Sequence, residues 1–173
     1  LGIDIVKPLP ALVQLVCSDK AVCKLGAGVR SYGSIELWVD GQCVANDTGE
    51  IQYTDYGISG IPVFQVSRFA VKAIDENREV KPVMNMIPDI TDSDIEDIFN
   101  RRIIAEGYKT LEQFFEGLIN KKLVAMIAAR CKISESKHIA DIDIEKMRHI
   151  IETMTHFGFV ITGDKGFDYG QVC

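Results

Sequence analysis

The sequence predicts an α+β fold in which a small antiparallel β-barrel, or a β-sandwich, carries an inserted α-helical subdomain. Short β-branched segments separated by glycine-containing turns fill the first half of the chain, as in barrels and sandwiches. Helix-capping sequences followed by apolar residues at helical spacing fill most of the second half. We expect the β part to span 1–90 plus 158–173, with a buried helix at about 59–75, and the helical part to span 91–157.

The clearest local signal is a β-hairpin in the first half of the chain. Apolar and polar residues alternate over 34–39, Asp40-Gly41 is typical of a type I′ turn, and 42–45 forms the returning strand. A second turn is predicted at Asn46–Gly49. Further strands are predicted at Ala11–Cys17, Glu50–Tyr53, Val80–Ile87, Phe159–Thr162 and Phe167–Val172.

The stretch from Gly49 to Arg68 connects the two kinds of structure. The residues Tyr56–Gly60 interrupt the β pattern and predict a loop with two glycines. Ser59 is expected to cap the helix that follows, and Pro62 is tolerated in its first turn, where no intrahelical N–H is required.

Three helix starts are predicted in the second half from capping residues. Ser93–Glu96 and Thr110–Gln113 have the capping-box pattern, and Asp143 precedes a further amphipathic helix. Together with the segment around Leu123 they predict a small helical bundle.

The composition is that of a globular protein with enough apolar residues for a core. The chain has 173 residues, of which 47% are apolar and 25% charged, and its formal net charge is −6. This acidic balance argues against a nucleic-acid partner, which requires a dense basic surface. No apolar run approaches the ~18 residues of a membrane span, and Lys7 and Pro8 interrupt the N-terminal segment. We therefore expect no membrane partner, no signal peptide and a cytoplasmic location.

Three groups of residues suggest chemistry but are incomplete as sites. The five cysteines form no CxxC pair and predict reduced, mostly buried thiols, with a Cys17–Cys23 redox pair as the minor alternative. Gly26-Ala27-Gly28 lacks the third glycine and the following helix of a dinucleotide loop. One face of the last helix carries four possible metal ligands but is explained as a solvated face: Glu145, His149, Glu152 and His156. We predict no catalytic residue and no metal site in this chain.

The remaining candidate is the glycine-containing segment between the strand and the buried helix. Its glycines allow close approach of a flat ligand, and the helix N-terminus offers free N–H groups. The alternative is a corner that packs against another domain. The candidate residues for contact with a cofactor or substrate are Thr54, Asp55, Tyr56, Gly57, Ser59 and Gly60.

Three sequence runs resemble the BaiN-like, aminoacetone-oxidase-like family of NAD(P)- and FAD-dependent flavoproteins. They are KLGAGVRSYGSIELWVDG, GEIQYTDYGISGIPVFQVSR and FGFVITGDKGFDYGQVC, and the most specific part is Gly49–Pro62. In that family an FAD-binding domain is interrupted by an insert made of a β-barrel and a helical subdomain. The family's dinucleotide glycine motif lies outside this insert, and the resemblance supplies no catalytic position within the chain.

The resemblance implies that the chain is the excised insert domain of an FAD-dependent oxidoreductase. In the parent protein it would cover the flavin and shape the substrate pocket, and NAD(P)H is a possible electron donor. Its expected partners are the FAD-binding domain of the same parent chain and a small-molecule substrate. The fragment alone is expected to be non-catalytic and to hold no FAD. The alternative from a different class is a stand-alone β-barrel module that binds a peptide or a protein partner.

Overall fold

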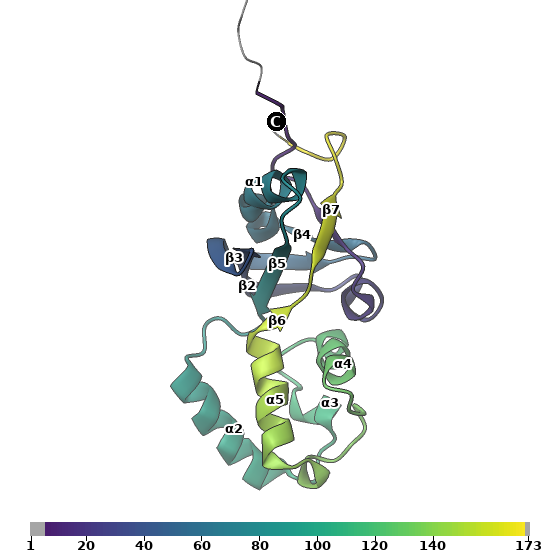
Figure 1. Ribbon diagram of the computed structural model, residues 1–173. Helices are drawn as coiled ribbons and strands as arrows, with labels where there is room; N and C mark the ends of the chain where they lie inside the picture. Colours follow the sequence, from purple (N-terminus) through teal and green to yellow (C-terminus); the bar gives the residue numbers. More distant parts are fainter. Residues whose placement is uncertain (1–5, 172–173) are drawn as a thin grey trace, which may run out of the picture.

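The computed structural model describes residues 6–171 and confirms the α+β class (Figure 1). The strands are β1 (Leu15–Cys17), β2 (Arg30–Val39), β3 (Gln42–Tyr53), β4 (Gly57–Gly60), β5 (Val80–Asn85), β6 (Phe157–Gly158) and β7 (Ile161–Asp164). The helices are α1 (Ile61–Asp75), α2 (Asp92–Glu106), α3 (Leu111–Phe114), α4 (Lys121–Arg130) and α5 (Ile144–Thr155), with short helical segments η1 (Ala21–Gly26) and η2 (Ile139–Asp141). No helix among the described residues is both long and apolar enough to cross a membrane.

The strands form one antiparallel sheet that curls into part of a barrel. Its strand order is β6-β5-β2-β3-β4-β1-β7, and every neighbouring pair is antiparallel. The curl brings β7, at one edge of the order, close to β5 near the other edge. The barrel alternative of the prediction is therefore the observed one.

Helix α1 packs against the sheet, mainly on β2, β3 and β4, and supplies part of its core. Val63, Val66 and Ala70 are fully or almost fully buried against the sheet, whereas Arg68 and Lys72 lie on an exposed stripe. Burial of each of the two valine side chains contributes about 1.5–3 kcal/mol. The helix predicted at about 59–75 is thus present, but it begins at Ile61 and keeps one polar face in solvent.

The hairpin is longer than predicted, and the prediction of a second turn at Asn46–Gly49 was wrong. Asp40 and Gly41 have φ values of 48° and 79°, as a type I′ turn requires. The residues Asn46–Gly49 do not turn but continue β3, because they pair with Gly33–Glu36 along β2. A Cβ on Gly49 would lie 3.1 Å from Cγ of Pro62, so this glycine allows α1 to approach the strand closely.

The segment predicted as a loop at Tyr56–Gly60 is mostly a strand. β4 pairs with β3 on one side and with β1 on the other, so it lies inside the sheet. Ser59 does not cap α1, because the capping position is Gly60 and no side chain accepts a hydrogen bond there. Pro62 does lie in the first helical turn, as predicted.

Both ends of the chain contain less strand than predicted. Of Ala11–Cys17 only the last three residues form β1, and Asp19 then caps η1 by accepting bonds from the amides of Ala21 and Val22 at 2.9 and 3.1 Å. Strand β7 covers Ile161–Asp164, whereas residues 167–171 contain a turn and a bend and no strand, and Val172 of the predicted strand lies outside the described residues.

The helical part begins at caps that the sequence predicts in two of three cases. Thr110 and Gln113 form the complete capping box of α3, and Asp143 caps α5 through the amide of Lys146. The predicted box at Ser93 was wrong by two residues, since Thr91 caps α2 by accepting from the amide of Asp94. The hydroxyl of a residue two positions upstream therefore replaces that of Ser93.

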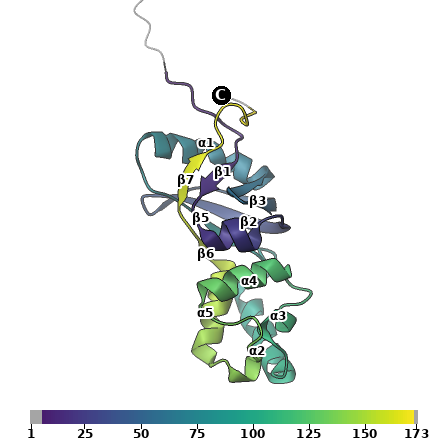
Figure 2. The ribbon, with the colours of Figure 1, turned by 90° about the vertical axis from the view of Figure 1, so that its right-hand side faces the viewer.

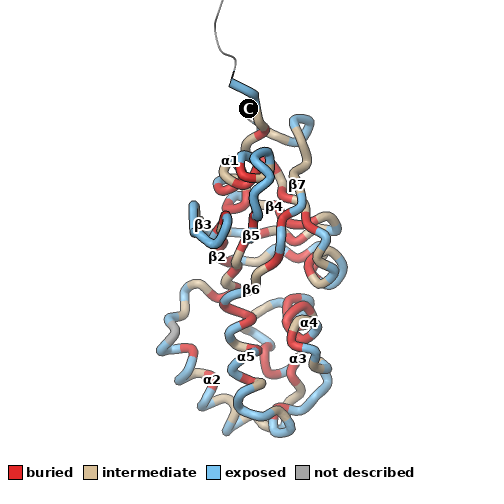
Figure 3. Tube along the Cα trace, viewed as in Figure 1, coloured by how far each residue is buried: buried red, intermediate tan, exposed pale blue. Residues whose placement is uncertain are grey.

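A cluster of phenylalanines forms the centre of the helical part. The rings of Phe99, Phe114 and Phe115 lie with centroids 5.3–5.7 Å apart, and all three side chains are almost fully buried. The buried positions continue from the sheet into α4 (Figure 3), and one contiguous apolar cluster includes residues of both parts. The division into domains at 91–157 stays a prediction.

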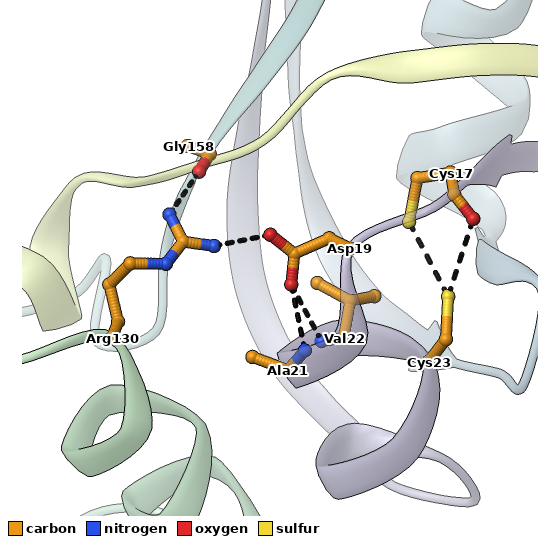
Figure 4. Close-up of polar contacts among 7 residues, drawn as sticks. All are labelled: Cys17, Asp19, Ala21, Val22, Cys23, Arg130 and Gly158. Atoms are coloured by element: carbon orange, nitrogen blue, oxygen red, sulfur yellow. Dashed lines mark hydrogen bonds and ion pairs between the residues drawn. The ribbon is translucent and has the colours of Figure 1, made fainter. Parts of the chain in front are cut away.

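Polar contacts join the helical part to the sheet at the level of η1 and β6. The guanidinium of Arg130 donates to Oδ2 of Asp19 at 2.6 Å and to the carbonyl of Gly158 at 2.7 Å (Figure 4). Its charge also lies 4.4 Å from the centroid of the Phe157 ring. Lys122 donates to the carbonyl of Ala27 at 2.7 Å, beside the packing of α4 on η1 that Figure 2 shows. The junction between the helical part and the sheet therefore combines these polar contacts with the packing of α4 on η1.

Candidate functional site

The first part of the candidate site is a tight turn between β3 and β4. The amide of Thr54 donates to the carbonyl of Gly57 at 2.9 Å, and the amide of Gly57 donates to the Thr54 hydroxyl at 3.0 Å. The carbonyl of Tyr56 accepts from the amide of Cys17 at 2.9 Å, which fixes the turn to β1. Asp55 is exposed at the tip. The turn thus presents a carboxylate, a hydroxyl and a phenol on a rigid backbone.

The glycines of this segment are explained by strand packing. A Cβ on Gly57 would lie 2.2 Å from the carbonyl oxygen of Leu15, and one on Gly60 would lie 2.3 Å from that of Glu50. Their φ values of 153° and 108° are also unfavourable for other residues. The neighbours that require glycine at these two positions are therefore strands of the same sheet. Ser59, between them, is buried.

Tyr56 belongs to an exposed cluster of aromatic rings around one lysine. Nζ of Lys165 lies 4.7 Å from the ring centroid of Tyr56 and 4.8 Å from that of Tyr169. Tyr169 is 54% exposed, so this cluster offers flat apolar surface together with a positive charge. Sequence reasoning included Tyr56 but missed Lys165 and Tyr169. Their local sequence carries no signal for the contact, which joins positions far apart in the chain.

The aromatic cluster lies beside the two segments at which the described chain begins and ends. The amide of Gln171 donates to the carbonyl of Ala11, and that of Lys165 donates to the carbonyl of Gln14, each at 3.2 Å. These segments run together at the upper end of Figure 1, opposite the helical part. The two ends of the described chain and the cluster therefore share one region of the surface.

The other end of the candidate segment borders a shallow hollow of about 280 Å³ beside the start of α1. Ser59 and Gly60 form part of its wall, and the ion pair between Arg30 and Glu50, with 3.3 Å between nitrogen and oxygen, forms another. Ile61 is 69% exposed at its rim. The structure thus separates the six predicted residues into an exposed turn, a buried strand and a hollow, rather than gathering them in one pocket.

The perturbed titratable groups next to the candidate segment are buried and protonated. Burial raises the pKa of the Tyr53 phenol and raises that of the Cys17 thiol to about 12. Sγ of Cys17 lies 3.6 Å from Sγ of Cys23, and the Cys23 thiol donates to the carbonyl of Cys17 at 3.4 Å. These groups are suited to packing, since a nucleophile or base would need a pKa nearer neutrality.

The four polar residues at α5 and its C-cap, Glu145, His149, Glu152 and His156, do not converge on one point. His149 Nδ1 lies 3.8 Å from Glu152 Oε2, whereas Nδ1 of His156 lies 2.9 Å from the hydroxyl of Thr155. Within residues 6–171, no group of three or more His, Cys, Asp or Glu side chains is placed to hold a metal ion.

Comparison with known proteins finds a matching family and a similar protein. A sequence model described as HI0933-like protein barrel and H2TH domain matches residues 9–172. The chain is also 33% identical over 165 residues to the 3-dehydro-bile acid delta(4,6)-reductase of Clostridium scindens (strain ATCC 35704 / DSM 5676 / VPI 13733 / 19). The match covers 95% of this chain but 40% of that reductase. The alternative of a stand-alone module gains no support from either match.

Proposed function

The chain belongs to the HI0933-like family with a barrel and an H2TH domain, and on this basis we propose that it is the insert domain of an FAD-dependent oxidoreductase. In this proposal the domain covers the flavin of the parent protein and shapes the pocket for a small-molecule substrate. NAD(P)H is the proposed electron donor. The observation that carries the proposal is the similarity over 95% of the chain to a reductase of which the match covers 40%.

The proposed contact with the rest of the parent protein lies where two segments far apart in the sequence meet. The amide of Gln171 donates to the carbonyl of Ala11 there. Next to them lie the exposed rings of Phe167 and Tyr169 and the ammonium of Lys165. Aromatic residues are enriched where one protein surface packs on another. We therefore propose that this region contacts the FAD-binding domain of the same parent chain.

The candidate segment fits a flavin only at its exposed ends. The strand residues Gly57 and Ser59 are enclosed by neighbouring strands, so they have no free face for a cofactor. The turn at Thr54–Tyr56 does have one, and its hydroxyl, carboxylate and phenol can donate to or accept from polar groups of a cofactor or substrate. A bound flavin would supply hydride transfer. The roles proposed for this turn are to bind, to orient and to exclude water.

The test uses the full-length parent protein together with variants of the aromatic cluster. Purified parent is expected to show flavin absorbance bands, and a Lys165→Met variant is expected to hold flavin or substrate more weakly. A matched control is Lys137→Met, since Lys137 is exposed in the helical part, away from the cluster. A parent without flavin bands, even after FAD is added, would overturn the oxidoreductase proposal. Flavin-loaded parent in which both variants behave alike would overturn only the placement of the cluster.

A further inference from the structure

A second cleft lies between the outer face of the sheet and the polar face of α5, and it has a volume of about 480 Å³. Strands β2 and β5 contribute Trp38 and Lys81, which are paired across the two strands and therefore project from the same face. Helix α5 contributes His149 and Glu152, and His156 follows at its C-cap. We propose that this cleft binds a mononucleotide, with its base on Trp38 and its phosphate on the cationic side chains.

The indole ring of Trp38 is held as one flat wall of the cleft. Its Nε1–H donates to Oε2 of Glu36 at 3.0 Å, a contact within the same strand, and this bond restricts rotation of the ring. Trp38 is only partly buried and lines the cleft, so part of its side chain is accessible there. Stacking of a base on an aromatic side chain is favourable and tolerates different bases.

The cationic side of the cleft begins at Lys81. Its side chain lies along Gly158, where a Cβ would come within 2.8 Å of Cε and 3.7 Å of Nζ of the lysine. Within the described part of the chain, Lys81 is not a member of any ion pair. An ammonium group that faces a cleft without a carboxylate partner is suited to an anion.

The opposite wall completes the match to a nucleotide. His149 in α5 and His156, which directly follows the last residue of α5, both line the cleft, and their ring nitrogens can donate to phosphate oxygens. A phosphate monoester offers three acceptor oxygens, which matches one ammonium and two imidazoles better than a carboxylate does. Glu152 lies between the histidines, where a carboxylate can accept hydrogen bonds from ribose hydroxyls.

The two walls belong to different parts of the fold and are held in place by Arg130. Both terminal nitrogens of this guanidinium are engaged by Asp19 and Gly158, and its side chain lines the cleft (Figure 4). The cleft is therefore preformed, which lowers the cost of ordering on binding. This site is independent of the proposed flavin role, because none of its residues belongs to the Thr54–Gly60 segment.

Fluorescence provides a specific test, because Trp38 is the single tryptophan of the chain. Titration of the 173-residue chain with AMP is expected to change the Trp38 emission saturably. Adenosine and inorganic phosphate, which each carry half of the ligand, are expected to bind at least about tenfold more weakly. Lys81→Gln is expected to weaken AMP binding by about tenfold or more, as loss of a charge-assisted hydrogen bond does. The matched control Lys137→Gln is expected to bind AMP like the wild type.

Calorimetry with the same ligands detects binding that does not change the Trp38 emission. Trp38→Phe, checked for folding by circular dichroism, is expected to retain AMP binding with an affinity that falls by a few-fold, since phenylalanine offers a smaller ring. Absence of both an emission change and binding heat up to ~5 mM AMP would overturn the proposal, because that limit corresponds to binding weaker than about −3 kcal/mol. Equal affinity of the Lys81→Gln and wild-type chains would also overturn it.

Discussion

Arg130 and Asp19 form an ion pair across the junction between the helical part and the sheet, with 2.6 Å between Nη2 and Oδ2. The two residues are 111 positions apart in the chain. Asp19 also accepts from two amides of η1, so one carboxylate caps a helical segment and receives the guanidinium. The Arg130 side chain thus links α4 to the segment after β1 through Asp19, and to β6, where the chain returns to the sheet, through Gly158.

Replacement of Arg130 by glutamine is expected to lower the free energy of unfolding by about 1–2 kcal/mol, because it leaves Asp19 and the carbonyl of Gly158 without their cationic donor. The side chains of Arg130 and Asp19 are 34% and 23% exposed, so solvent screening keeps the loss below that of a fully buried pair. Urea denaturation measures it. The control is Arg148→Gln, which removes an ion pair whose side chains are 68% and 77% exposed and is expected to cost less than about 0.5 kcal/mol. Equal losses in the two variants would contradict a structural role for the Arg130 contact.

The capping box of α3 gives a second prediction in the helical part. Thr110→Ala removes the hydroxyl that accepts from the amide of Gln113 and is expected to cost about 1 kcal/mol in thermal or urea unfolding. Thr110→Ser keeps an acceptor at the same place and is expected to stay within a few tenths of a kcal/mol of the wild type. If serine destabilises as much as alanine, the threonine methyl group rather than the cap accounts for the effect.

Local signals predicted those elements whose cause is local. The turn at Asp40-Gly41 and the caps Thr110 and Asp143 were predicted because each depends on backbone geometry or hydrogen bonds within a few residues. The turn predicted at Asn46–Gly49 was wrong because the pairing partner of these residues, β2, overrides their turn preference. The length of β3 is therefore determined by its pairing with β2 and not by the turn preference of its own residues.

The candidate site shows the same limit. The segment Thr54–Gly60 was selected for its glycines, and a loop and an interior strand that both require glycine have the same sequence signature. The contact between Tyr56 and Lys165 and the pairing of Trp38 with Lys81 depend on strands brought together by the fold. No spacing in the sequence indicates either pair, so these contacts are visible only in the structure.

The cysteines are expected to react with iodoacetamide in the order of their thiolate content and exposure. Burial raises the pKa of Cys17 to about 12, so at about pH 8 this residue remains a thiol, whereas Cys43 is exposed. Mass spectrometry of timed samples is expected to show Cys43 labelled early and Cys17 late. Labelling of Cys17 as fast as Cys43 in the folded chain would contradict the burial of this thiol.

The raised pKa of Cys17 also predicts how the free energy of unfolding changes at alkaline pH. The thiol form of Cys17 is favoured in the folded state, while in the unfolded state it ionises above its ordinary pKa of 9.0. This contribution to the free energy of unfolding is therefore complete below pH 9.0 and decreases as the pH rises toward about 12. A Cys17→Ala variant is expected to lack that part of the alkaline decrease, as measured by urea denaturation at several pH values.

The role of Gly60 distinguishes strand packing from ligand contact at the candidate site. Its φ of 108° is unfavourable for alanine, and an added Cβ would lie 2.3 Å from the carbonyl oxygen of Glu50. Gly60→Ala is therefore expected to cost at least about 2–4 kcal/mol in urea denaturation of the chain without any ligand. The control is Gly163→Ala in β7, where no atom lies within 4 Å of the added Cβ, and its expected cost is about 0.5 kcal/mol or less.

A Gly60→Ala chain as stable as the wild type would mean that the glycine is not required by β3. The absence of a side chain at Gly60 would then make room for a group outside the sheet, and the hollow beside Ser59 and Ile61 would be the candidate position for that group. The expected loss of stability has the opposite consequence. It assigns the glycine to the joint between β3, β4 and α1, and it leaves the exposed turn at Thr54–Tyr56 as the part of this segment that is free to face a cofactor or a substrate.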